Sequence, residues 1–216
     1  MSTPRTDLPG ATADDAATTL PTLVPRDRRG LTLHETVLLA VLAVVFGFLY
    51  WAFVQAWYGL QIAMGPLGDL AQNVLAGSWI MVAPLAVYIV RKPGVGVVVE
   101  ILAALVEVAF LGSPVGPMLL LVGFIQGATA ELPFALTRYR HFGWPTFLAS
   151  GVSAGVLTFA YNAFRQGWLG QEYLGLRFAF TLASCILLSA VAAKLLGDGL
   201  LRTGVLDNQA IGRAAR

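Results

Sequence analysis

The sequence has little charge. Only 12% of its 216 residues are Asp, Glu, Lys or Arg, whereas a soluble globular domain carries about 25%. Hydrophobic residues make up 57% of the chain, and its mean hydropathy is +0.73. So few charges cannot cover a water-facing surface of ordinary polarity, which argues against a cytosolic enzyme and a secreted disulfide-stabilised module. A net charge of +2 leaves no broad basic surface for nucleic acid.

Residues for redox, metal and hydrolytic chemistry are also scarce. The single cysteine, Cys185, excludes an internal disulfide and a multi-cysteine metal site, and its apolar surroundings predict a buried side chain. The two histidines, His34 and His141, lie near the ends of apolar runs. The chain has no phosphate-binding loop, no H-E-x-x-H zinc motif and no G-x-S-x-G nucleophile motif. We therefore expect no catalytic residues, no metal and no cofactor in this chain.

Long uncharged runs separate the few charges. They cover residues 36–68, 70–90, 108–130, 141–164 and 178–193. A membrane-spanning helix needs about 20 mainly apolar residues, with roughly 17–25 as the range. Most of the runs reach that length, so the sequence predicts an all-α membrane protein.

Six candidate spans lie between Pro- and Gly-containing breaks. They form a transmembrane domain over residues 34–200, between a disordered cytoplasmic tail, 1–33, and a short cytoplasmic tail, 201–216. We expect the apolar stretch 58–69, too short to span, to fold back over the outer mouth. The six spans are 35–57, 70–90, 93–111, 117–137, 144–164 and 174–196.

Basic residues gather at alternate ends of these spans. They precede the first span, join the second to the third and the fourth to the fifth, and follow the sixth. Because cytoplasmic loops of membrane proteins carry an excess of Lys and Arg, we predict a six-helix bundle with both termini in the cytoplasm.

Carboxylates inside predicted spans suggest a binding cavity. Glu100 and Glu107 are seven residues apart, nearly two helical turns, and therefore share a helix face. A buried carboxylate costs at least about 2.5 kcal/mol in a bilayer, so it normally faces protein or a wet cavity. Carboxylates beside aromatic rings suit a flat ligand that carries nitrogen. The residues expected to line an outward-facing substrate site are Glu107, Glu100, Trp79, Gln126, Asn162, Tyr161, Trp57 and Tyr58.

Structural alternatives exist for several of these residues. Glu107 in its protonated form can hydrogen-bond to a neighbour, and tryptophans such as Trp57 also occur in interfacial aromatic belts without a ligand. We expect a third acid, Glu131, to be a structural partner of Arg138 or a polar packing group.

Small residues recur at four-residue spacing, which lets helices approach closely in lipid. The pairs are Ala43 with Gly47, Gly123 with Gly127, and Gly151 with Gly155. One interpretation is packing within the bundle. The other is that the first pair, together with Ala40, faces another subunit.

Two segments carry a resemblance to a known family. Residues 91–112 (RKPGVGVVVEILAALVEVAFLG) and 123–140 (GFIQGATAELPFALTRYR) resemble the YkoE-type substrate-binding subunits of energy-coupling factor (ECF) vitamin importers. The resemblance covers roughly residues 34–200, including the number of spans, the size and the orientation.

The resemblance implies a function that the composition does not. S components of this class are six-helix proteins of the bacterial cytoplasmic membrane, and they bind a vitamin or its precursor on the outer side. They associate with a coupling membrane subunit and two cytosolic ATPases. The subfamily is associated with thiamine or its hydroxymethylpyrimidine precursor. By type and spacing, Ala40, Ala43 and Gly47 match the coupling surface on the first helix.

Two other function classes remain open from the residues. A stand-alone proton-coupled carrier would use Glu100, Glu107 and Glu131 as relay groups. An intramembrane enzyme or assembly factor is disfavoured because the chain lacks a His or Ser catalytic set.

Overall fold

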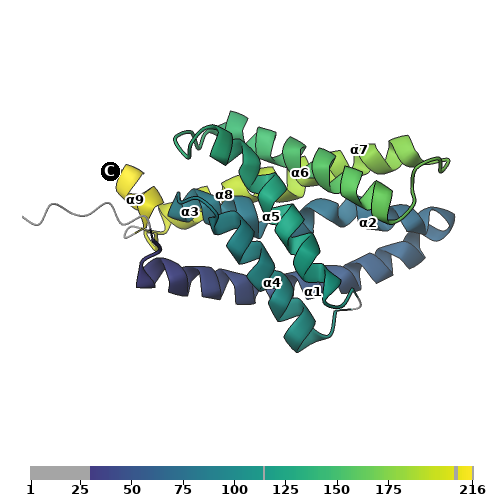
Figure 1. Cartoon of the computed structure of the whole chain (residues 1–216), viewed down its shortest axis with the longest axis horizontal. Helices are drawn as coiled ribbons and strands as arrows, with labels where there is room; N and C mark the ends of the chain where they lie inside the picture. Colours follow the sequence, from purple (N-terminus) through teal and green to yellow (C-terminus); the bar gives the residue numbers. More distant parts are fainter. Residues whose placement is uncertain (1–29, 114, 207–208, 216) are drawn as a thin grey trace, which may run out of the picture. The chain divides into compact units, whose positions relative to one another are not determined.

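All regular secondary structure in the described residues is helical. The computed structural model describes residues 30–113, 115–206 and 209–215, and these contain no strand. Most of the predicted N-terminal tail, residues 1–29, lies outside the described residues. The helical elements are α1 (Leu33–Met64), η1 (Gly65–Leu70), α2 (Ala71–Leu75), η2 (Ala76–Ile80), α3 (Val82–Val90), α4 (Val95–Leu111), α5 (Met118–Leu136), α6 (Trp144–Arg165), α7 (Leu174–Ser184), η3 (Cys185–Val191, a π-helix), α8 (Ala192–Arg202) and α9 (Ala210–Ala215) (Figure 1).

Four stretches of the described chain are long and apolar enough to cross a membrane. They are Leu33–Val90, Met118–Leu136, Trp144–Arg165 and Leu174–Arg202. The all-α prediction is therefore confirmed for the described residues, and α4, with 17 residues, is shorter than these stretches.

The longest stretch, Leu33–Val90, is a hairpin. α1 ends at Met64 because Gly65 takes a positive φ of +54° and Pro66 follows it. The returning arm runs antiparallel to α1: the Trp79 indole Nε1 donates to the Tyr50 carbonyl over 3.1 Å. At the far end of the hairpin, Lys92 Nζ pairs with Glu35 Oε2 over 2.6 Å.

The first helix is longer than predicted. α1 continues past Trp57 to Met64, so the expectation that residues 58–69 fold back as one segment is wrong. Residues 58–64 contain no proline, and the first strong break after Trp57 is the Gly65–Pro66 pair. Only Gly65–Leu70, a 3-10 helix, makes the turn.

Helices meet closely at glycines within the chain. A Cβ on Gly47 in α1 would lie 2.7 Å from the Val106 Cβ of α4, and one on Gly127 in α5 would lie 2.7 Å from the Val97 Cα of α4. α4 is therefore packed tightly between α1 and α5.

Of the three residues predicted for a subunit interface on α1, two are buried in this packing and one is exposed. Ala43 is 2% exposed and Gly47 is buried against α4, whereas Ala40 is exposed. A partner that used Ala43 or Gly47 would first have to separate α1 from α4. In this conformation only Ala40 of the three is available to another subunit.

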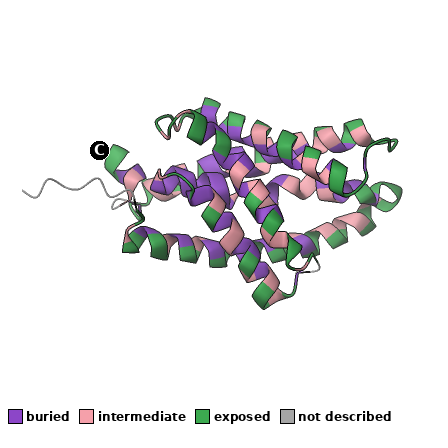
Figure 2. Ribbon diagram, in the orientation of Figure 1, coloured by how far each residue is buried: buried purple, intermediate pink, exposed green. Residues whose placement is uncertain are grey.

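The core centres on α3. All nine of its residues are buried, and Figure 2 shows the buried ribbon there against the exposed outer side of α1. Leu206 and Ile211, from the segment predicted as a C-terminal tail, also belong to the core. Part of that segment therefore packs on the helices.

Candidate ligand-binding site

A pocket opens between α1, the returning arm of the hairpin, α4, α5 and α6. It contains about 730 Å³ of space outside protein atoms, including the part open to solvent. Its apolar wall includes Val54, Ala104, Leu119 and Val122. Its polar and aromatic lining consists of Tyr50, Trp57, Gln72, Trp79, Glu100, Glu107, Gln126, Asn162 and Arg165.

One carboxylate oxygen of Glu100 is hydrogen-bonded and the other has no partner in the described structure. The Tyr50 hydroxyl donates to its Oε1 over 2.9 Å, and the side chain is buried with 1% exposure. Within the described structure, Glu100 Oε2 has no hydrogen-bond partner. Buried polar atoms are normally hydrogen-bonded, so this oxygen is available to a donor that enters the pocket.

Glu107 lies on the same face of α4 as Glu100, as its spacing predicted. The Ser113 hydroxyl, just beyond the end of the helix, donates to Glu107 Oε1 over 2.8 Å. Glu107 is only 2% exposed but still lines the pocket. Glu107 is therefore both hydrogen-bonded to a neighbour and part of the pocket lining.

Two tryptophans form aromatic surfaces of the pocket. Trp79 is fixed by its hydrogen bond to Tyr50 and by an edge contact with Phe53, with ring centroids 6.5 Å apart. Trp57 has a buried indole Nε1 without a partner in the described structure. Its N–H can therefore donate to an incoming acceptor.

Six of the eight predicted substrate residues meet at this pocket. They are Trp57, Trp79, Glu100, Glu107, Gln126 and Asn162. Tyr58 and Tyr161 do not line it. Each is the chain neighbour of a lining residue, and one step along a helix turns a side chain by about 100°. Tyr58 is instead exposed and stacks on Trp57, with ring centroids 5.1 Å apart.

Three polar lining residues were not predicted. Tyr50 lies seven residues before Trp57, Gln72 seven before Trp79, and Arg165 three after Asn162. Extending each predicted position along its helix face would have found them.

Glu131 has a structural role away from the pocket, and Arg138 is not its partner. Its Oε1 accepts from the Gly94 amide over 2.6 Å and from the Tyr139 hydroxyl over 2.6 Å, and its Oε2 accepts from the Val97 amide over 3.1 Å. A carboxylate is stabilised at a helix N-terminus, here that of α4. Burial and the adjacent Glu131 raise the pKa of Tyr139 above its usual range, so this hydroxyl stays a donor.

A buried arginine, Arg177, links helices near the hairpin turn. The Arg177 guanidinium contacts the Asp69 carboxylate and donates to Asn73 Oδ1 over 3.3 Å. It also lies over the Trp168 ring, 4.9 Å from the centroid. These contacts join α7 to η1 and α2.

Metal-binding groups do not cluster in the described part of the chain. No set of three or more His, Cys, Asp or Glu residues is close enough there to hold a metal ion. Cys185 is a free, buried thiol, as the sequence predicted.

Comparison with known proteins places this architecture in a family. Residues 34–157 match the family described as the ABC-type cobalt transport system, permease component. The chain is 36% identical over 183 residues to a protein named as an HMP/thiamine permease, YkoE, of Bacillus subtilis (strain 168), covering 84% of this chain and 90% of the relative.

A solved structure shows the same fold. The crystal structure of an S-component of an ECF transporter superposes with a TM-score of 0.78 at 34% identity, covering 86% of this chain and 93% of the other. The chain therefore belongs to the ABC-type cobalt transport system permease-component family and, within it, to the YkoE-type S components of energy-coupling factor transporters, which are membrane proteins.

Proposed function

We propose that this chain is the substrate-binding subunit of an ATP-driven ECF importer for hydroxymethylpyrimidine or thiamine. The observation that carries the proposal is the buried Glu100 carboxylate, which lines the pocket and whose Oε2 has no hydrogen-bond partner in the described structure. A ligand with an amino group would satisfy this oxygen by a charge-assisted hydrogen bond.

An aminopyrimidine complements the other surfaces of the pocket as well. Its flat ring can stack on Trp57 or Trp79, and its ring nitrogens can accept from the unpartnered Trp57 Nε1. Thiamine adds a fixed positive charge, which an ionised Glu107 would favour. The relative named as an HMP/thiamine permease supports this substrate class.

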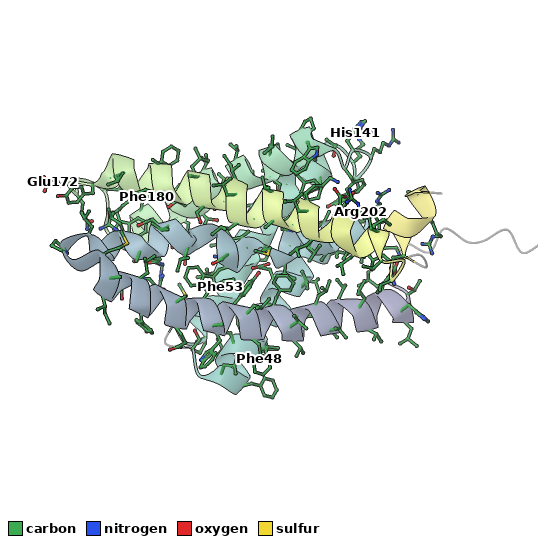
Figure 3. All side chains as sticks on the ribbon, turned by 180° about the vertical axis from the view of Figure 1, so that it is seen from behind. Phe48, Phe53, His141, Glu172, Phe180 and Arg202 are labelled. Atoms are coloured by element: carbon green, nitrogen blue, oxygen red, sulfur yellow. The ribbon has the colours of Figure 1, made fainter. Side chains whose placement is uncertain are left out.

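We propose six membrane crossings with both termini in the cytoplasm of a bacterium. The hairpin supplies two crossings, and α4, whose 17 residues extend about 25 Å, supplies another. Figure 3 shows His141 and Arg202 at one end of the helices and Glu172 at the other. The basic end would face the cytoplasm, and the pocket would open outward.

Energy for transport would come from partner proteins. The proposed partners are a coupling membrane subunit and two cytosolic ATPases. The outer face of α1 is a candidate docking surface because Ala40 is exposed there beside large apolar side chains. These exposed neighbours are Val37, Val41, Val44 and Phe48.

A stand-alone proton-coupled carrier is the alternative function. It has less support, since Glu131, one of its three relay groups, is held by the α4 N-terminus. Liposomes that contain only this chain distinguish the two. Substrate uptake that stops when the proton gradient is removed would support the carrier, whereas uptake only with coupling proteins and ATP supports the importer.

Calorimetry on the purified full chain tests the substrate. We expect saturable binding of hydroxymethylpyrimidine or thiamine and none of Co²⁺, the cargo in the family's description. Binding of neither pyrimidine by folded protein would contradict the proposed substrate, and Co²⁺ binding alone would replace it.

A further inference from the structure

We propose that the pocket accepts thiamine in its phosphate ester form, with Arg165 binding the phosphate at the mouth. This inference rests on the proposed function and deepens it. It concerns one residue of the pocket, Arg165, at the end of α6.

The pocket has two buried acids in its wall and an exposed arginine at its mouth. Among its lining residues only Val115 and Arg165 are exposed, so they mark the mouth. Glu100 and Glu107 are 1% and 2% exposed. Glu107 accepts from Ser113, two residues before Val115, whereas Glu100 lies nearly two helical turns further from that end of α4. A ligand that extends from Glu100 to the mouth therefore has an acid at one end and a guanidinium at the other.

Arg165 is not engaged elsewhere in the described structure. The ion pairs there are Lys92 with Glu35, Arg177 with Asp69, and Lys194 with Asp198. Arg177 is buried and bonded to Asp69 and Asn73, whereas Arg165 makes no such contact. Its guanidinium, with five N–H donors in a fork, remains available for an anion.

This arrangement does not suit free thiamine alone. The thiazolium carries a permanent positive charge, which an arginine at the mouth repels. A phosphate ester on the hydroxyethyl arm brings about −1.5 to −2 charges at pH 7. The resulting ligand can place its amino group at Glu100 and its phosphate at Arg165.

The geometry of a phosphate favours arginine as its partner. Arginine can bind phosphate through two parallel N–H bonds. Asn162, one helical turn before Arg165, lines the same pocket and supplies an additional amide donor. The binding of the inner pyrimidine by Glu100 does not depend on either residue.

The test compares three ligands on full-length wild-type protein and on Arg165→Gln, by calorimetry at low salt. The ligands are hydroxymethylpyrimidine, thiamine and thiamine monophosphate. In the wild type, thiamine monophosphate should bind more tightly than thiamine. Arg165→Gln should weaken binding of the phosphate ester by about tenfold or more. It should leave the affinity for hydroxymethylpyrimidine unchanged and increase the affinity for thiamine slightly.

Two further variants serve as controls. Arg165→Lys keeps the positive charge but loses the paired N–H donors of the guanidinium. Its affinity for the ester should therefore lie between those of the wild type and Arg165→Gln. Arg140→Gln removes an exposed arginine outside the pocket and should change no affinity. Because Arg165 is exposed, its variants should fold, which monodispersity on gel filtration checks.

The outcomes separate this inference from the function on which it rests. If the wild type binds hydroxymethylpyrimidine or thiamine but rejects the ester, the inference is overturned and the proposed function stands. An equal loss of affinity for all three ligands in Arg165→Gln would also overturn the inference. If the folded wild type binds none of the three, both proposals fail.

Discussion

The hydroxyl of Tyr50 donates to Glu100 over 2.9 Å and simultaneously accepts the Val82 amide over 3.2 Å. One side chain of α1 thereby links α4 to the start of α3. It fixes the carboxylate through Oε1, and Oε2 has no hydrogen-bond partner in the described structure. Positioning a binding group through a second residue reduces the ordering cost when a ligand arrives.

Replacing Glu100 should separate ligand binding from folding. Glu100→Gln keeps the size of the side chain but removes the charge that strengthens a hydrogen bond to an amino group. We expect affinity for hydroxymethylpyrimidine or thiamine to fall by about tenfold or more. Calorimetry measures this. Glu172→Gln, an exposed Glu→Gln control away from the pocket, should bind normally; equal affinity in both variants would remove Glu100 from the site.

Removing the Tyr50 hydroxyl should weaken both stability and binding. Tyr50→Phe leaves the Val82 amide, which is fully buried, without its acceptor. The loss should cost about 1–3 kcal/mol of stability and lower the melting temperature in a thermal unfolding assay. Affinity should also fall, though less than in Glu100→Gln. A Tyr50→Phe protein with unchanged melting temperature would show that this bond does not stabilise the fold.

Enlarging Gly47 should damage the fold. A Cβ at this position already approaches Val106 to 2.7 Å, so Gly47→Leu must separate α1 from α4. Overpacking of this kind costs about 1–3 kcal/mol or more. We expect a smaller folded fraction on gel filtration and a lower melting temperature in a thermal unfolding assay. Normal stability would mean that α1 can shift away from α4 without loss.

Enlarging Ala40 should leave folding and ligand binding intact but reduce transport. Ala40 is exposed on α1, so Ala40→Leu should fold and bind ligand as the wild type does. If the outer face of α1 docks the coupling subunit, the added bulk should reduce ATP-dependent uptake in proteoliposomes that contain all subunits. Full uptake by this variant would place the docking surface elsewhere.

Local signals in the sequence were sufficient to predict the helices and most of their ends. Uncharged apolar runs predicted the helical segments, and Pro and Gly marked breaks such as 91–94 and 143–145. Helical spacing correctly placed Glu100 and Glu107 on one face, because a 3.6-residue repeat depends only on the chain's own geometry.

Relations between helices required the tertiary structure. Sequence spacing cannot say which partner a face meets, so it could not show that Gly47 packs on Val106 or that Glu131 caps α4 instead of pairing with Arg138. It also could not show that the end of α6 brings Arg165 to the mouth of the pocket. The apolar pattern determines that a helix forms and which residues share its face, whereas close packing against neighbouring helices decides where that face points.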